Sequence, residues 1–229
     1  MELENFDAEL FCNYYNKNLY FNDYEKRLYK RGLSLCINNP KGSILLTGIN
    51  PSGTDAESNS IFYDFKYTKG SFWNKKLELF TPNLLDKVAY LDLFPQKEST
   101  QDVFEKETSI DFRARMIEIT QMEIERLMPK LVIIANKQSQ YYWGFNKDTT
   151  WMGYNLERVN EEIIKGKEIY LYKVNGFQPE NDRINQDKLH TTHIKYILLY
   201  AMYDKRHETK YANRILSAEQ IEQLYTYLK

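Results

Sequence analysis

The sequence predicts an α/β protein with a three-layer α/β/α arrangement around a central, mainly parallel sheet of four strands. Two observations lead to this fold class. Short apolar runs of strand length recur along the chain, and stretches with apolar residues three and four positions apart separate them. Strands that alternate with helices in this way form parallel sheets whose two faces are covered by helices.

Four apolar runs are expected to form the sheet. Each has the length of a strand, and turn residues, a proline or a polar segment follow it. The runs are Ile44 to Gly48, Val88 to Phe94, Leu131 to Ala135 and Ile169 to Val174. Because these runs are apolar at nearly every position, they are typical of strands that are buried on both faces.

Helical periodicity predicts the two outer layers. The clearest helix is Ser109 to Met128, which has an apolar face and ends at Pro129. Ser217 and Gln220 form a capping box that opens the last helix. The other expected helices are one or two within residues 4–36, Phe72 to Phe80, Ser139 to Trp143, Thr192 to Tyr203 and Ala218 to Leu228.

Length and composition favour one domain. The 229 residues contain no stretch typical of a linker, so we expect a single domain over residues 1–229, with helical extensions at 1–40 and 205–229. Lys and Arg number 31 against 32 Asp and Glu, which gives a net charge of -1. Binding to a nucleic acid would therefore depend on local basic patches.

Cysteine usage and hydropathy predict where the protein resides. Cys12 and Cys36 show neither CxxC spacing nor a disulfide framework, and the acidic N-terminus differs from a signal peptide. No apolar run approaches the ~20 residues that span a bilayer. We therefore expect a cytoplasmic monomer without membrane contact.

The stretch that most suggests a function follows the first predicted strand. Ile44 to Gly48 gives way abruptly to the turn Ile49-Asn50-Pro51-Ser52-Gly53. In an open α/β sheet, ligands bind at the carboxyl ends of the parallel strands. The turn would therefore lie at the mouth of a binding site, although turns of this kind also end strands that have no function.

Several short motifs occur in an order that resembles one known family. They are Gly48-Ile49-Asn50-Pro51-Ser52-Gly53, Phe62 twelve residues after Asn50, Phe72-Trp73, and a strand ending Asp92-Leu93-Phe94-Pro95. Pro129 to Ile134 adds a further apolar strand. Together they resemble the uracil-DNA glycosylase superfamily, most closely its mismatch-specific uracil/thymine branch, over roughly residues 43–200.

The chain also departs from the family pattern. Ser52 replaces a glycine, Gly70-Ser71 replaces the Asn-Arg before Phe72-Trp73, and Asn136 replaces a glycine after the third strand. The family's last motif, a His-Pro-Ser or Asn-Pro-Ser turn, has no clean match. Its counterpart is either His190-Thr191-Thr192-His193 or Asn175-Gly176-Phe177.

The resemblance implies hydrolysis of the N-glycosidic bond of uracil, or of a mismatched or damaged base, in DNA without a cofactor. The nucleotide would be extruded from the stack into the site. Asn50 would orient the water, because a neutral amide is no base, and His193 or His190 would donate to the departing base. The implied substrate contacts are Gly48, Ile49, Pro51, Ser52, Gly53, Phe62, Phe72, Asp92, Thr191 and Thr192.

Simpler structural roles compete with these assignments. Asn50 suits a turn, Phe62 suits core packing, and the two histidines suit a cap or an exposed surface. A metal site at the histidines lacks an evident third ligand. Two other functions stay open: a catalytically inactive nucleic-acid or nucleotide binding module on the same fold, and an enzyme acting on single nucleotides or nucleosides.

Overall fold

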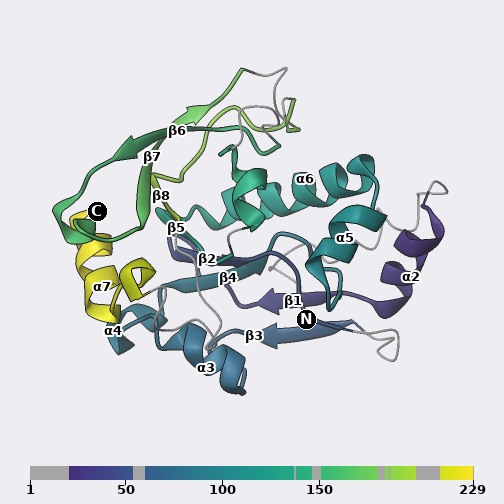
Figure 1. Cartoon of the computed structure of the whole chain (residues 1–229), viewed down its shortest axis with the longest axis horizontal. Coiled ribbons are helices and arrows are strands. Elements are labelled where there is room, and N and C mark those ends of the chain that lie inside the picture. Colours follow the sequence, from purple (N-terminus) through teal and green to yellow (C-terminus); the bar gives the residue numbers. More distant parts are fainter. Residues whose placement is uncertain are drawn as a thin grey trace.

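The computed structural model describes residues 21–53, 60–136, 138–145, 151–179, 184–185, 187–199 and 212–228. Its centre is a six-stranded sheet in the order β4-β2-β5-β8-β7-β6 (Figure 1). Four neighbouring strands, β4, β2, β5 and β8, are parallel, whereas β7 and β6 extend the sheet as an antiparallel pair. The strands are β2 (Ile44–Gly48), β4 (Val88–Asp92), β5 (Leu131–Ile134), β6 (Tyr154–Val159), β7 (Tyr170–Phe177) and β8 (Tyr196–Leu199).

The sequence predicted four of these strands, and all four lie in the one sheet. The number of strands was wrong, because β6 and β8 bring it to six. Thr192 to Tyr203 was expected to be a helix, but Tyr196–Leu199 forms the strand β8 between β5 and β7. A short apolar run fits either structure, and here hydrogen bonds to strands on both sides favour the extended form.

Helices cover both faces of the sheet, because alternate residues of each strand point to opposite sides. On one face, Leu45, Leu91 and Val132 pack with residues of the long helix α6 (Ile110–Leu127). On the other face, Leu46, Tyr90 and Ile133 pack with residues of the last helix, α7 (Ala218–Tyr227). The three-layer α/β arrangement is therefore built on two separate apolar cores.

Shorter helices complete each outer layer. Figure 1 shows α5 (Gln101–Glu107) beside α6, and α3 (Ser71–Leu77) with α4 (Pro82–Leu85) below the sheet. The helix α2 (Asp23–Arg31) and the 3-10 helix η1 (Gln138–Trp143) pack on the α6 side. Two further 3-10 turns are η2 (Glu162–Ile164) and η5 (Ala212–Arg214).

The predicted helix ends agree with the structure at α6 and α7. Ser109 Oγ accepts from Phe112 N at the start of α6, and Met128 ends this helix in a left-handed conformation before Pro129. Ser217 and Gln220 form the expected capping box of α7. Local side-chain chemistry therefore sets these boundaries.

A second, two-stranded sheet lies beside β4 and corrects two expectations. β1 (Ser34–Ile37) pairs in parallel with β3 (Ile61–Asp64). The first strand overlaps residues 4–36, where one or two helices were expected and of which 4–20 lie outside the described residues. The second falls in a stretch for which the sequence predicted neither a strand nor a helix. Leu35 faces one core and Cys36 the other, so a strand buries both side chains where a one-sided helix would not.

The buried side chain of Asn39 joins this small sheet to the edge of the large one. Asn39 Nδ2 donates to Cys36 O at 3.3 Å and to Tyr90 O at 3.2 Å. Tyr90 N donates to Asn39 Oδ1 at 2.9 Å. One amide therefore satisfies both backbone groups of Tyr90 on the side of β4 that has no neighbouring strand in its sheet.

We expect Asn39→Ala to lower the free energy of unfolding by roughly 2–4 kcal/mol, because it removes the partner of both buried backbone groups of Tyr90 and of Cys36 O. Urea unfolding followed by circular dichroism measures this loss. The control is Asn175→Ala, which removes an exposed amide that donates to Glu157 and should lower the free energy of unfolding by no more than about 0.5 kcal/mol. Equal losses in the two variants would contradict the bridging role.

Candidate functional site

The turn after β2 is held by the segment that follows β4. Phe94 N donates to Ile49 O at 2.8 Å, and Glu98 N donates to Pro51 O at 2.9 Å. Asn50 Nδ2 donates to Glu98 O at 2.7 Å and to Pro51 O at 3.2 Å. Asn50 Oδ1 is buried and accepts no hydrogen bond from the described residues. The amide is thus fixed through its nitrogen, and its oxygen could accept a hydrogen bond from a ligand or a water.

Glu98 anchors this segment through its own buried carboxylate. The carboxylate accepts from Arg31 Nη1 at 2.6 Å, from Tyr24 OH at 2.7 Å, and from the backbone N–H of Ser99 and Thr100. Burial would raise the pKa of Glu98, but the hydrogen bonds and the Arg31 charge hold it below its usual range. The loop that positions Asn50 therefore depends on an ion pair linking α2 to the end of β4.

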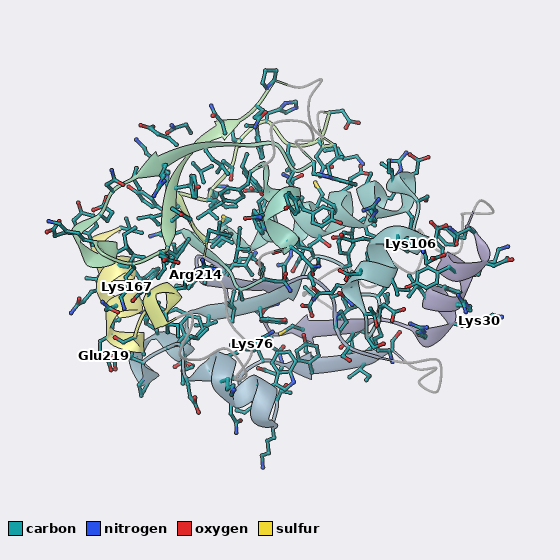
Figure 2. The ribbon with its side chains drawn as sticks, in the orientation of Figure 1. Lys30, Lys76, Lys106, Lys167, Arg214 and Glu219 are labelled. Carbon is teal, nitrogen blue, oxygen red and sulfur yellow. The ribbon has the colours of Figure 1, made fainter. Side chains whose placement is uncertain are left out.

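A second polar cluster lies where β4 ends, beside Gly48. Lys76 Nζ donates to Tyr90 OH, and Tyr90 OH donates to Asp92 Oδ1 at 2.7 Å. Lys76 is 3% exposed and Tyr90 1% exposed, whereas Asp92 is partly exposed. In Figure 2, Lys76 lies on α3 next to the sheet, whereas Lys30 and Lys106 lie at the periphery. The cluster thus leads from the interior to the carboxyl edge of the sheet.

Aromatic rings surround the Lys76 ammonium group. Its nitrogen lies 4.8 Å from the centre of the Trp73 ring and 4.0 Å from that of Tyr90. Tyr63 and Phe65 lie against the same rings, with centroids 5.0 Å from Trp73 and 5.3 Å from Tyr90 respectively. Ring faces attract a cation, so they compensate part of the cost of burying it.

Burial and charge act in opposite directions on this cluster. Burial lowers the pKa of Lys76 to about 8, although the Asp92 charge raises it. Burial raises the pKa of Asp92, although the Lys76 charge and the Tyr90 hydrogen bond lower it. Burial also raises the pKa of Tyr90. Perturbed groups of this kind are enriched at functional sites but also occur in structural networks.

The close approach of Asp92 explains the glycine at the end of β2. Gly48 and Asp92 are paired in register, and a Cβ at position 48 would collide with Asp92 Oδ1 and Tyr90 OH. The Asp92 side chain therefore leans from β4 over the backbone of β2. Two residues that the sequence proposed for the site, Gly48 and Asp92, are in contact here.

Lys76 and Tyr90 were missed by the sequence analysis. Tyr90 lies two residues before Asp92 on the same strand, a spacing that puts both side chains on one face of the sheet. Lys76 follows Trp73 by three residues in a helix, which puts these two on one face of α3. Periodicity could have joined each pair, but nothing in the sequence indicates that the two pairs meet.

The other proposed substrate contacts are distributed as follows. The turn Ile49 to Gly53 lies at the carboxyl edge with Asp92. Phe62 belongs to β3 and is 50% exposed; its partner strand β1 starts beside Pro95, where Ser34 N donates to Pro95 O. Phe72 is the second residue of α3, and its side chain lies outside the described part of the structure.

The structure does not bring His190 and His193 to the edge that holds Asn50. They precede β8, and Ile44, Leu131 and Tyr196 are level with one another at the amino ends of parallel strands. Asn50 lies six residues beyond Ile44, or roughly 20 Å along an extended chain. A catalytic role of the histidines stays a prediction, but strand direction gives it no support at this site.

The segment with the histidines is fixed instead to the C-terminal end of α6. The buried carboxylate of Glu125 accepts from Thr192 Oγ1 at 2.7 Å, from His193 N at 3.1 Å and from Tyr154 OH at 2.8 Å. Thr191 and both imidazoles are exposed. The alternative counterpart, Asn175 to Phe177, ends the antiparallel strand β7 and therefore lies at the same amino edge.

Comparisons with known proteins leave the family open. A scan against protein-family models found no match. A search of curated proteins found none either. The resemblance to the uracil-DNA glycosylase superfamily therefore stays a prediction that depends on the sequence motifs given above.

Two further properties follow from the described residues alone. They contain no group of three or more His, Cys, Asp or Glu side chains that could hold a metal ion. No helix among them is long and apolar enough to cross a membrane.

The depressed pKa of Glu98 gives a prediction about acid stability. Its pKa in the folded protein lies below the unfolded value of about 4.5, so its stabilising contribution is present above pH ~4.5 and is lost as the pH falls further. Glu98→Gln should therefore be less stable than wild type at pH 7, and this difference should shrink towards pH 3. Urea unfolding at a series of pH values measures it.

The matched control is Glu162→Gln, which removes an exposed carboxylate paired with Lys165. Its stability should follow the wild-type pH dependence closely. A constant difference between Glu98→Gln and wild type over the whole range would contradict the assigned role of the ionised Glu98.

Proposed function

We propose that the protein hydrolyses the N-glycosidic bond of uracil, or of a mismatched or damaged base, in DNA at the turn after β2. The observation that carries the proposal is the Asn50 amide, whose Nδ2 is committed to Glu98 O while Oδ1 is buried and accepts nothing from the described residues. An unpaired buried acceptor costs about 1–3 kcal/mol. A bound water that donates to Oδ1 would relieve this cost.

The chemistry of the bond agrees with such a group. As the bond breaks, the sugar gains positive charge and the base gathers negative charge, so the attacking water has to be held in place without losing its nucleophilicity. An amide oxygen accepts one proton of the water and leaves the oxygen lone pair free for attack. Asn50 is therefore suited to orient the water, as the family resemblance implies.

The surroundings supply a surface for the extruded base. Phe62 is a half-exposed ring on β3, whose partner strand β1 begins beside the segment that fixes Asn50. Aromatic rings stack on bases of any sequence. This arrangement supports a substrate with a splayed-out base, in DNA or as a single nucleotide.

A nucleotide-binding module without catalysis is the second candidate. It is favoured by the positions of the two segments that would hold a donor for the departing base, His190 to His193 and Asn175 to Phe177. Both lie at the amino edge of the sheet. If no other group at the carboxyl edge replaces them, the turn would bind a base without releasing it.

We expect Asn50→Ala to lower the rate of base release by roughly 10²-fold or more and to leave the affinity for DNA within a few fold, because the water contact matters mainly in the transition state. Single-turnover release of uracil from a labelled oligonucleotide measures the rate, and fluorescence anisotropy measures the affinity. The control is Asn83→Ala, which removes an exposed amide beside Glu222.

The outcome also separates the two candidate functions. A wild-type protein that binds DNA or a nucleotide but releases no base from uracil, mismatch or lesion substrates would be a binding module. Asn50→Ala would then have no rate to lower, and Asn50 would be a turn residue only.

A further inference from the structure

We propose that Asp92 accepts the proton of the water that Asn50 orients, and that Tyr90 and Lys76 are positioning residues that fix the Asp92 carboxylate at the carboxyl edge. This inference rests on the proposed function and deepens it. It names the base that the reaction needs and gives this role to Asp92, which the sequence predicted only as a substrate contact.

Hydrolysis requires such a base. The water oxygen forms a bond to C1′ of the sugar, the bond from C1′ to the base nitrogen breaks, and its electron pair leaves with the base. One proton of the water must be taken up in the same process, and it later passes to the departing base or to solvent. Asn50 cannot take it, because a neutral amide has no useful proton affinity.

The strand pairing puts Asp92 next to the turn. Asp92 is the register partner of Gly48, and Asn50 follows Gly48 by two residues. Leu93 N donates to Gly48 O at 3.2 Å, so β2 and the segment after β4 stay paired at this point. The Asp92 carboxyl group occupies the space above Gly48 that a side chain would fill, so it leans towards the end of β2, which leads into the turn with Asn50.

Exposure distinguishes Asp92 from the groups behind it. Tyr90 and Lys76 are buried, whereas Asp92 is partly exposed and is the end of the hydrogen-bonded series that a substrate could reach. Tyr90 OH donates to Asp92 Oδ1 and accepts from Lys76 Nζ. These two hydrogen bonds orient the Asp92 carboxylate from the interior of the protein. The arrangement is a carboxylate held by a donor that is itself held by a cation.

Four titratable groups face Asp92 from the elements packed around it. They are Lys76 on α3, Tyr90 on β4, Tyr63 on β3 and Cys36 on β1. Burial raises the pKa of Tyr63, and it raises the pKa of Cys36 to about 12, so both are neutral at pH 7. Within this group, the charge that lowers the pKa of Asp92 is that of Lys76.

The effect on the reaction follows from this balance. Burial raises the pKa of Asp92, which makes the carboxylate a stronger base, whereas the Lys76 charge and the Tyr90 hydrogen bond lower it. Removing either partner raises the pKa of Asp92 further. The reaction would then reach its full rate only at a higher pH, although the Asp92 side chain itself is still present.

The test measures single-turnover base release against pH for wild type, Asp92→Asn, Tyr90→Phe and Lys76→Met, with circular dichroism and DNA affinity measured for each. We expect Asp92→Asn to lower the rate of base release about 100-fold or more and to abolish the acid limb of the pH–rate profile, while the affinity for DNA is retained. Tyr90→Phe and Lys76→Met should move the acid limb to higher pH. The control is Asp86→Asn, whose carboxylate is exposed and paired with Lys66, and its profile should match wild type.

Each other result overturns a defined part of the inference. If wild type releases the base and the rate of Asp92→Asn is within about threefold of the wild-type rate, Asp92 is excluded as the proton acceptor and the proposed function stays intact. An unmoved acid limb in Tyr90→Phe would exclude the positioning role, and this variant decides the point if Lys76→Met does not fold. Absence of release by wild type would overturn the proposed function and the role of Asp92 together.

Discussion

The pairing of β2 with β4 determines the geometry of the carboxyl edge. It places Gly48 beside Asp92, and it continues past the ends of the strands through Phe94 to Ile49 and Glu98 to Pro51. Asn50 is fixed by this continuation rather than by its own turn alone. The glycine at position 48 is what permits the approach, since any side chain there would displace the Asp92 carboxyl group.

Some of the buried charged groups lie beside this pairing. The Arg31–Glu98 ion pair lies behind the turn, and Lys76 lies beneath Asp92. Burying such groups costs several kcal/mol of desolvation per ion, and apolar residues of similar size often give equal or higher stability. Stability alone therefore does not explain them. The proposed site would account for them, because it has to hold an amide and a carboxylate in fixed positions and buried hydrogen bonds restrict orientation.

The sequence predicted the parts of the fold that depend on local pattern. The apolar runs of β2, β4 and β5, the face of α6 and the cap at Ser217 are local signals, and the structure contains them. The strand β8 was missed because four apolar residues do not define a period, and its identity is set by its neighbours β5 and β7. That error also misplaced the histidines, since residues that precede a parallel strand lie at the opposite edge from those that follow one.

The candidate site was predictable in part for the same reason. Asn50, Gly48 and Asp92 stand next to recognisable strands, whereas Glu98 and Lys76 resemble surface charges in sequence and acquire their partners only through tertiary packing. The most direct test of the central claim is a crystal structure with a DNA oligonucleotide whose target deoxyuridine carries a 2′-fluorine to slow bond cleavage. We expect C1′ of the extruded nucleotide at the carboxyl edge, with a water hydrogen-bonded to Asn50 Oδ1 and Asp92. A nucleotide bound at the amino edge beside His193, or a water held by neither residue, would contradict the claim.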